Sequence, residues 1–209
     1  MPHKRRFIAI GITGGIGSGK TEVCRIFERL GVPALSADSI AKEISNYDPR
    51  VRQLLTQSLG TRAYTADGIL DRAYVASKVF SNKSVQKRIN SIIHPRVEEE
   101  VKRRFKEMEI AGTPIGIVEA ALIYEAGLDR LLNAVVVVNA PEETRIDRVV
   151  NRDAASRSSV LDRMKAQMDP VAKLQKADYV IYNEGSIEDL EQKVKFLYSI
   201  FQNLSTDKP

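Results

Sequence analysis

One glycine-rich segment constrains the fold of this chain more than any other feature. Residues 14–21 read GGIGSGKT and match the pattern G-x-x-x-x-G-K-[ST]. The apolar residues 6–12, RFIAIGI, predict a buried strand before it, and residues 21–31, TEVCRIFERLG, predict an amphipathic helix after it that ends at Gly31. This is the context in which the pattern binds phosphate groups. The sequence therefore predicts a nucleotide-binding α/β fold.

The residue types in this loop can be explained by the chemistry of phosphate binding. Glycines let successive backbone N–H groups turn toward one anion, and the helix N-terminus adds a partial positive charge. We expect Lys20 to reach the β- and γ-phosphates and the hydroxyl of Thr21 to ligate Mg²⁺. A glycine-rich turn that binds nothing would need neither side chain. The ATP-binding residues expected in the loop are Gly14, Gly15, Ile16, Gly17, Ser18, Gly19, Lys20 and Thr21.

Four further segments predict strands of the same sheet. They are residues 32–38, 114–124, 133–141 and 177–185, and the four consecutive valines of NAVVVVNAP are typical of a strand covered on both faces. Helical segments separate them, and SIEDLEQKVKFLYSIFQNL predicts a long helix near the end of the chain. Strands that alternate with helices indicate a parallel sheet between two helical layers. We expect a three-layer α/β fold with a five-stranded parallel sheet.

A long segment without strands separates the second and third strands. It predicts helices over SIAKEISNY, PRVRQLLTQSLG, DRAYVASKVFS and residues 83–110, and Pro95 should kink or divide the last one. We expect a single domain over residues 1–209, in which this insertion is a helical, substrate-binding lobe and a second helical region, rich in arginine, is a lid. The expected boundaries are about 1–60 and 112–209 for the core, 61–111 for the lobe and 151–172 for the lid.

Composition limits the kinds of ligand and location that suit this chain but does not decide its function. The net charge of +5 suits an anionic ligand such as a nucleotide, and it would also suit nucleic acid. The one cysteine, Cys24, excludes an intramolecular disulfide and predicts a small core-facing residue, with a reactive thiol as the alternative. No segment approaches 18 apolar residues, and the apolar segment near the start leads directly into the glycine-rich loop. We expect a cytoplasmic protein, a monomer or small homo-oligomer, without membrane or nucleic-acid partners.

The other motifs favour a kinase over the remaining nucleotide-binding classes. A GTPase should carry N-K-x-D and D-x-x-G, and neither pattern occurs. A translocase or assembly ATPase is usually larger and has two acids at the end of one strand, whereas here Glu119 is followed by Ala120. A short chain with a helical insertion and an arginine-rich late segment suits a kinase with an acceptor lobe and a lid.

Two acids follow predicted strands, where parallel strands present their carboxyl ends to a ligand. Asp38 ends the second predicted strand, beside the first strand if the strand order is the usual one. It suits a proton acceptor for a hydroxyl substrate and equally an N-cap of the next helix. Glu119 ends the third predicted strand and suits a Mg²⁺-bound water or the substrate, or a structural charge.

Arginines after the fourth predicted strand supply positive charge for a transferring phosphoryl group. Arg145, Arg148 and Arg152 have the spacing of one helix face, and Arg157 and Arg163 follow in the expected lid. An arginine binds phosphate oxygens bidentately, although a single arginine is more often a solvated surface residue. The cluster favours Arg148 and Arg152 as ATP-binding residues.

These segments together resemble the dephospho-coenzyme A kinase family over nearly the whole chain. The resemblance rests on GITGGIGSGKTE, SAD at 36–38, LDRAYVASKVFSN, INSIIHPRV, EAALIYEAG, RIDRVVNRD, DRMKAQ and ADYVIYNEG. It implies a P-loop kinase that uses ATP to phosphorylate the ribose 3′-hydroxyl of dephospho-coenzyme A, the last step of coenzyme A synthesis.

The resemblance also implies roles for individual residues. Asp38 matches the second acid of the family's D-A-D and is its proton acceptor; Arg148 matches a lid-side arginine on the phosphates, and Asn183 lies in the adenine-side loop. His94, which by itself suits a capping or packing residue, belongs to the acceptor wall. The expected catalytic residues are Asp38, Lys20 and Arg148, and the expected substrate-binding residues are Asp38, His94, Glu119, Leu122 and Ile123.

Two departures from the family pattern concern the acceptor side. Ser36 stands where the family usually has the first acid, and the family's D-x-P-L-L-F-E is EAALIYE here, without its proline. These changes put the acceptor contacts in doubt but not the reaction. A nucleoside or nucleotide monophosphate kinase and a regulatory ATPase module stay open as rivals.

Overall fold

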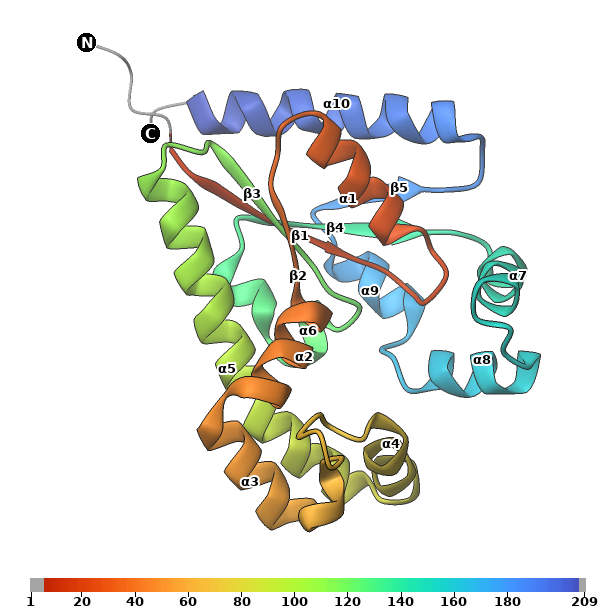
Figure 1. Cartoon of the computed structure of the whole chain (residues 1–209). Helices are drawn as coiled ribbons and strands as arrows, with labels where there is room; N and C mark the ends of the chain where they lie inside the picture. The colour runs from red at the N-terminus through yellow and green to blue at the C-terminus, as the bar shows by residue number, and fades with distance from the viewer. Residues whose placement is uncertain (1–5, 207–209) are drawn as a thin grey trace. The chain divides into compact units, whose positions relative to one another are not determined.

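A five-stranded parallel sheet forms the centre of the fold. The structure is a computed structural model that describes residues 6–206, without the side chains of residues 80 and 81. The strands are β1 (Ile8–Thr13), β2 (Ala34–Ser36), β3 (Ile115–Glu119), β4 (Ala134–Asn139) and β5 (Tyr179–Tyr182), in the order β2-β3-β1-β4-β5 (Figure 1). Every neighbouring pair is parallel. The expectation of a five-stranded parallel sheet is confirmed.

The position expected for the second strand was wrong. β2 pairs with β3, with Ser36 opposite Glu119, and β3 separates it from β1. β3 is a longer strand whose first four residues are buried, whereas the three residues of β2 are only partly buried. The more apolar strand therefore takes the inner place and the short strand forms the edge, because burial of apolar surface decides the order. β2 also ends at Ser36, so that Asp38 belongs to the next helix.

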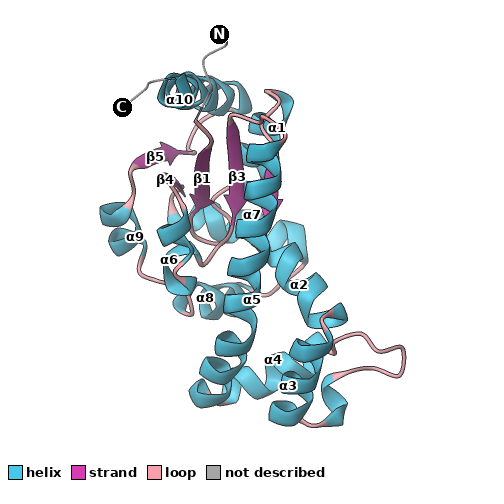
Figure 2. Cartoon of the chain, turned by 90° about the vertical axis from the view of Figure 1, so that its left-hand side faces the viewer, coloured by secondary structure: helices cyan, strands magenta, loops and turns pink. Residues whose placement is uncertain are grey.

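The sheet carries helices on both faces. On one face, α1 (Lys20–Arg29) and α10 (Ile187–Thr206) pack on each other and on the strands (Figure 2). On the other face, Gly116 lets Phe105 approach the sheet from the end of α5 (Lys83–Ile110), and Gly11 admits Ile123 of α6 (Ile123–Ala126). The strands are accordingly apolar on both sides, as the valine sequence of β4 predicts.

Cys24 belongs to the core between α1 and the sheet. Its side chain packs among Val23, Phe27 and strand residues, and it is 5% exposed. Burial raises the pKa of the thiol far above its usual range, so that the reactive thiolate is disfavoured. The expectation of a small core residue is confirmed.

The described chain forms two compact units, one of residues up to 36 together with residues from 104 onward, and one of residues 37–103. The first unit contains the sheet and, after β3, η2 (Leu128–Leu131), α7 (Glu142–Asp153), α8 (Arg157–Lys165) and α9 (Pro170–Lys176). The second contains α2 (Ala37–Tyr47), α3 (Pro49–Leu59), η1 (Thr61–Ala63), α4 (Arg72–Ser81) and the first part of α5. The roles of core, acceptor lobe at 61–111 and lid at 151–172 stay predictions.

The helical unit has an apolar core of its own. Val51, Leu55 and Leu59 of α3 pack with Ala63 and with Ile89 of α5. The side chain of Asp48 caps α3 by accepting the N–H of Val51, and the side chain of Asp71 caps α4 in the same way. The helices predicted for this segment are confirmed at both ends to within two residues.

Pro95 does not divide its helix, contrary to one of the two outcomes expected. α5 is continuous over 28 residues with Pro95 inside it. A proline removes the hydrogen bond to the carbonyl four residues earlier, here that of Ser91. Both residues are exposed, so water can satisfy this carbonyl and the helix continues.

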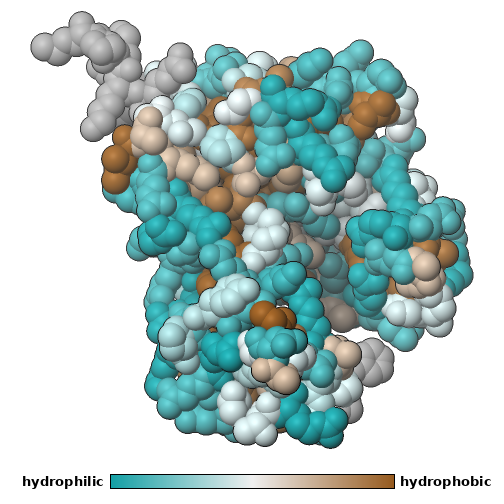
Figure 3. Space-filling view, in the orientation of Figure 1, coloured by the Kyte–Doolittle hydropathy of each residue, from teal (hydrophilic) through white to brown (hydrophobic). Residues whose placement is uncertain are grey.

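The surface in view is mostly hydrophilic, with small apolar areas between charged side chains (Figure 3). Among the helices in residues 6–206, none combines the length and the apolar character needed to cross a membrane.

Candidate active site

The glycine-rich loop joins the central strand to the first helix of the sheet unit. Gly14, Gly17 and Gly19 have φ values of 152°, 79° and 97°, which side chains rarely tolerate. Space is also short: a Cβ on Gly17 would lie 2.3 Å from the carbonyl oxygen of Arg145, and one on Gly19 2.2 Å from Nδ2 of Asn183. Glycine is therefore required at these positions by both conformation and packing.

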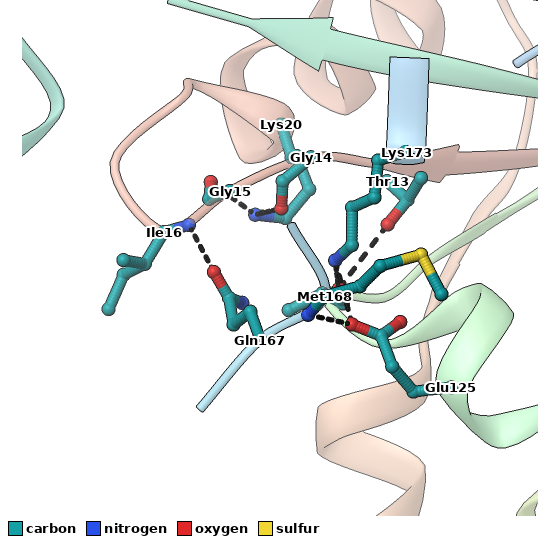
Figure 4. Close-up of polar contacts among 10 residues, drawn as sticks. Thr13, Gly14, Gly15, Ile16, Lys20, Glu125, Gln167, Met168 and Lys173 are labelled. Carbon is teal, nitrogen blue, oxygen red and sulfur yellow. Dashed lines mark hydrogen bonds and ion pairs between the residues drawn. The ribbon is translucent and has the colours of Figure 1, made fainter. Parts of the chain in front are cut away.

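Lys20 closes the loop upon itself. Its Nζ donates to the carbonyl oxygens of Gly14 and Gly15 at 3.1 and 3.2 Å (Figure 4). The ammonium group thus lies along the loop, at the N-terminus of α1. An anion bound by the loop would meet this charge together with the helix N-terminus.

Thr21 and Glu119 bring two hard oxygen ligands together. The hydroxyl of Thr21, on the first turn of α1, donates to Oε1 of Glu119 at 3.1 Å. Glu119 is the last residue of β3, the strand beside β1, so the carboxyl end of the sheet holds the carboxylate next to the loop. A hydroxyl and a carboxylate suit Mg²⁺, which prefers oxygen ligands and keeps several waters.

Two arginines of α7 lie close to the loop. Arg145 is 5% exposed, donates from Nε to the carbonyl oxygen of Ala140 at 3.1 Å and lies against Gly15. Arg148 comes within 3.5 Å of the carbonyl oxygen of Ser18 and within 3.4 Å of that of Asn183. The helix therefore places two guanidinium groups at the phosphate-binding loop.

Asn183 fastens the end of β5 to the same loop. Its Nδ2 donates to the carbonyl oxygen of Ser18 at 2.8 Å, and its side chain is 7% exposed. Beside it lies a hollow of about 320 Å³. Its lining combines the charged and polar residues Glu22, Arg148, Asn183 and Ser186 with Gly19, Gly185, Ile187 and Leu190. A flat heterocycle with polar edges fits such a lining.

The remaining arginines of the cluster pair with carboxylates. Arg152 lies 2.7 Å from Oδ1 of Asp153, and Arg163 lies 3.0 Å from Oδ2 of the same residue. Arg157 pairs with Glu143 at 2.7 Å. The hydrogen bonds from Arg152 and Arg163 lower the pKa of Asp153 well below its usual range. The assignment of Arg152 to ATP stays a prediction.

Asp38 lines a hollow within the helical unit. It is exposed on the first turn of α2. The hollow, about 320 Å³, is lined by Asp38 together with Lys42 and Arg72, and its other lining residues are Ala41, Ser45, Asn46 and Leu70. Two cations beside a carboxylate suit a ligand that carries both a hydroxyl group and negative charge. The role of Asp38 as proton acceptor stays a prediction.

The other expected acceptor residues have different environments. His94 is half-buried on α5, and burial lowers the pKa of its imidazole. Leu122 is partly buried at the start of α6, whereas Ile123 is fully buried and packs against Gly11. All three assignments stay predictions, and in this structure the side chain of Ile123 lies in the core.

Three residues near the loop received no role from the sequence. Gln167, Glu125 and Lys173 form polar contacts around the loop, and Lys173 is 2% exposed. Glu125 and Gln167 lie in segments that resemble the family, but a glutamate and a glutamine inside helical segments give no signal of their own. A buried lysine can be found only from the tertiary structure.

Comparison with known proteins decides the family. The family model for dephospho-CoA kinase matches residues 8–189. The chain belongs to the dephospho-CoA kinase family. A dephospho-CoA kinase of Syntrophotalea carbinolica is 36% identical over 187 residues, which cover 90% of this chain and 89% of that protein. The resemblance stated from the sequence is therefore confirmed.

Solved structures agree with this membership. A Thermus thermophilus protein has a TM-score of 0.78 at 33% identity, covering 94% of this chain and 98% of its own. A dephospho-CoA kinase of Campylobacter jejuni has a TM-score of 0.68 at 26% identity, covering 94% and 96%. The family match spans the glycine-rich loop, the helical unit and Asn183 of this dephospho-CoA kinase family member.

Proposed function

We propose that this chain transfers the γ-phosphoryl group of ATP to the ribose 3′-hydroxyl of dephospho-coenzyme A, which completes coenzyme A synthesis. The observation that carries the proposal is the phosphate-binding loop on the central strand of a dephospho-CoA kinase family member. The enzyme is a kinase of the P-loop type.

The donor half of the proposed site is the loop with its neighbours. The backbone N–H groups of residues 14–21 and the ammonium of Lys20 bind the β- and γ-phosphates, and Arg148 adds charge from α7. The adenine lies in the hollow beside Asn183. These groups stabilise the charge that spreads over the transferring phosphoryl oxygens.

The acceptor half of the proposed site centres on Asp38. Its carboxylate orients the 3′-hydroxyl and takes its proton while the oxygen attacks the γ-phosphorus and the bond to the ADP oxygen breaks. Lys42 and Arg72, which line the same hollow, bind negative charge of the acceptor. The lid at residues 151–172 excludes water, which would otherwise accept the phosphoryl group.

The divalent cation that P-loop kinases generally require is proposed to be Mg²⁺. The hydroxyl of Thr21 and the carboxylate of Glu119 fit this ion, because both are oxygen ligands and lie 3.1 Å apart. When bound, Mg²⁺ neutralises charge on the β- and γ-phosphate oxygens. Glu119 acts either on the ion through water or on the substrate.

A product assay tests the proposal. The chain is incubated with ATP, Mg²⁺ and one acceptor, either dephospho-coenzyme A, AMP or another nucleotide, and the products are separated by chromatography. We expect ADP and coenzyme A in equal amounts when the acceptor is dephospho-coenzyme A, and no phosphorylated product with the other acceptors. Phosphorylated AMP would favour a nucleotide kinase, and ADP without a phosphorylated product would favour a regulatory ATPase. The cytoplasmic location, the monomeric or small homo-oligomeric state and the absence of nucleic-acid partners stay predictions.

A further inference from the structure

A glutamine contacts the phosphate-binding loop from a distant part of the chain. The Oε1 atom of Gln167 accepts the backbone N–H of Ile16 at 3.0 Å, across 151 positions of sequence (Figure 4). Ile16 is the third residue of the loop, where the orientation of each peptide decides which N–H groups face an anion. Gln167 therefore fixes one peptide of the loop from outside it.

The residue after Gln167 is held at a second point. Oε1 of Glu125, on α6, accepts the backbone N–H of Met168 at 2.9 Å. The same oxygen lies 3.0 Å from Nζ of Lys173 on α9. One carboxylate oxygen thus joins α6, α9 and the segment that carries Gln167.

Lys173 also connects α9 to the beginning of the loop. Its Nζ donates to the carbonyl oxygen of Ala121 at 2.7 Å, and the hydroxyl of Thr13, the last residue of β1, approaches the same oxygen at 3.4 Å. The side chain of Lys173 is 2% exposed, and a charge on such a buried side chain persists only with partners such as these. Its two contacts restrict where the segment 167–168 can lie.

We propose that Gln167 is a positioning residue for the donor nucleotide and that the ion pair between the buried Lys173 and Glu125 acts through it. Gln167 holds the Ile16 peptide in the orientation that accepts the phosphates, and the ion pair holds Gln167 in place. The inference rests on the proposed function only for the identity of the donor, ATP. It adds to that function a path from α6 and α9 to the phosphate-binding loop.

The contact geometry makes a loss of nucleotide affinity the expected consequence. Without Oε1 of Gln167 the Ile16 peptide is free to turn, and the loop must then be ordered by the nucleotide itself, which lowers affinity. The size of the effect is that of one lost hydrogen bond, about three- to tenfold in the dissociation constant.

Calorimetric titration with ATP and Mg²⁺, without any acceptor, tests this in the full chain. We expect Gln167→Leu to raise the dissociation constant about three- to tenfold. Gln175→Leu is the matched control, because it makes the same chemical change on the exposed side of α9, and it should bind as the wild type does. Unchanged or tighter binding by Gln167→Leu would overturn the proposal.

A double-mutant cycle tests whether Lys173 acts through Gln167. Lys173→Met should weaken ATP binding in the wild-type background and have less than about a twofold effect in the Gln167→Leu background. Effects that multiply in the double variant would show that Lys173 acts independently, which contradicts the proposal. Lys195→Met, which removes a lysine from an exposed pair on α10, is the control.

Conservative variants keep the test decisive if Lys173→Met does not fold. Lys173→Arg retains the cation and should keep the wild-type affinity for ATP, whereas Glu125→Gln keeps an acceptor for Met168 but removes the negative charge and should weaken binding. Wild-type affinity in Glu125→Gln would overturn the role of the pair. In kinetics, Gln167→Leu should raise KM for ATP more than it lowers kcat.

The titrations with ATP contain no acceptor, so their outcome does not depend on which acceptor the chain phosphorylates. If the wild type binds ATP but does not phosphorylate dephospho-coenzyme A, the proposed function fails while the titrations still decide the role of Gln167. If coenzyme A forms and Gln167→Leu binds ATP normally, only this inference fails.

Discussion

The hydroxyl of Thr21 donates a hydrogen bond of 3.1 Å to the carboxylate of Glu119, across 98 positions of sequence. The bond joins the first turn of α1 to the end of β3 and places a hydroxyl and a carboxylate, two oxygen groups that suit a hard cation, at the phosphate-binding loop. Removing the hydroxyl of Thr21 should weaken metal binding more than it disturbs the fold, because the side chain of Thr21 is exposed.

Thr21→Val should therefore raise the Mg²⁺ concentration for half-maximal activity about 10–100-fold, the range typical of a lost group around a bound metal. The measurement is activity against Mg²⁺ concentration at constant ATP. Thr206→Val, which removes a hydroxyl from the exposed end of α10, is the control and should leave the Mg²⁺ response unchanged. An equal Mg²⁺ response in both variants would contradict the assignment.

Asp38→Asn should lower kcat about 10²–10⁴-fold, because the amide can orient the acceptor hydroxyl but cannot take its proton. ATP binding, measured by calorimetry, should survive because no part of the loop is changed. Glu43→Gln on the exposed side of the same helix is the matched control. A kcat near that of the wild type would show that Asp38 is not the proton acceptor.

Arg148 and Arg152 differ in their surroundings, which predicts different losses. Arg148 approaches the loop carbonyl of Ser18, whereas Arg152 is held by Asp153. Arg148→Met should weaken ATP binding about 10–100-fold, as expected for a charge-assisted hydrogen bond, and Arg152→Met clearly less. Equal losses in the two titrations would indicate that nucleotide binding draws Arg152 away from Asp153.

Gly17→Ala and Gly112→Ala separate the cost of an unfavourable backbone conformation from the cost of a steric clash. Both glycines have φ of 79°, but a Cβ on Gly17 meets the backbone of Arg145 and one on Gly112 meets nothing within 4 Å. Gly112→Ala should cost about 1–2 kcal/mol of unfolding free energy from conformation alone. Gly17→Ala should cost more, because backbone must move. Denaturant titration of the two variants makes the comparison, and equal costs would contradict it.

His94 should make stability depend on pH. Burial lowers the folded pKa of its imidazole, so the unfolded chain binds the proton more readily. Stability is then fully present above the unfolded pKa, about 6.5, and decreases as the pH falls below it toward the folded pKa. Thermal unfolding between about pH 5 and 8 should show a weaker acid-side loss for His94→Gln than for the wild type. Parallel profiles would exclude this role.

Local patterns were sufficient for the elements of the fold. Each predicted strand overlaps an observed one, since apolar, β-branched segments between glycines and polar residues are typical of strands in an α/β chain. The helix over residues 83–110 was correct at both ends, and of the two outcomes expected at Pro95 the division of the helix was wrong. Whether a proline breaks a helix depends on whether water can reach the freed carbonyl, and exposure is a tertiary property.

The order of the strands needed the tertiary structure. Pairing of β2 with β3 instead of β1 depends on which strand buries more apolar surface between its neighbours, and this compares segments about 80 positions apart. The contact of Gln167 with Ile16 of the loop and that of Lys173 with the carbonyl oxygen of Ala121 also join distant segments. Neither residue type carries a local signal for such a contact.

The sequence by itself determined the phosphate-binding loop, the helix that follows it and the alternation that makes a parallel sheet, because glycine conformation, helix capping and hydrophobic period act over a few neighbouring residues. Only the tertiary structure decided which side chains surround that loop. Thr21 contacts Glu119, Arg148 contacts Ser18 and Gln167 contacts Ile16, across 98, 130 and 151 positions of sequence. Such contacts depend on how the whole unit packs, and no short segment of sequence determines this packing.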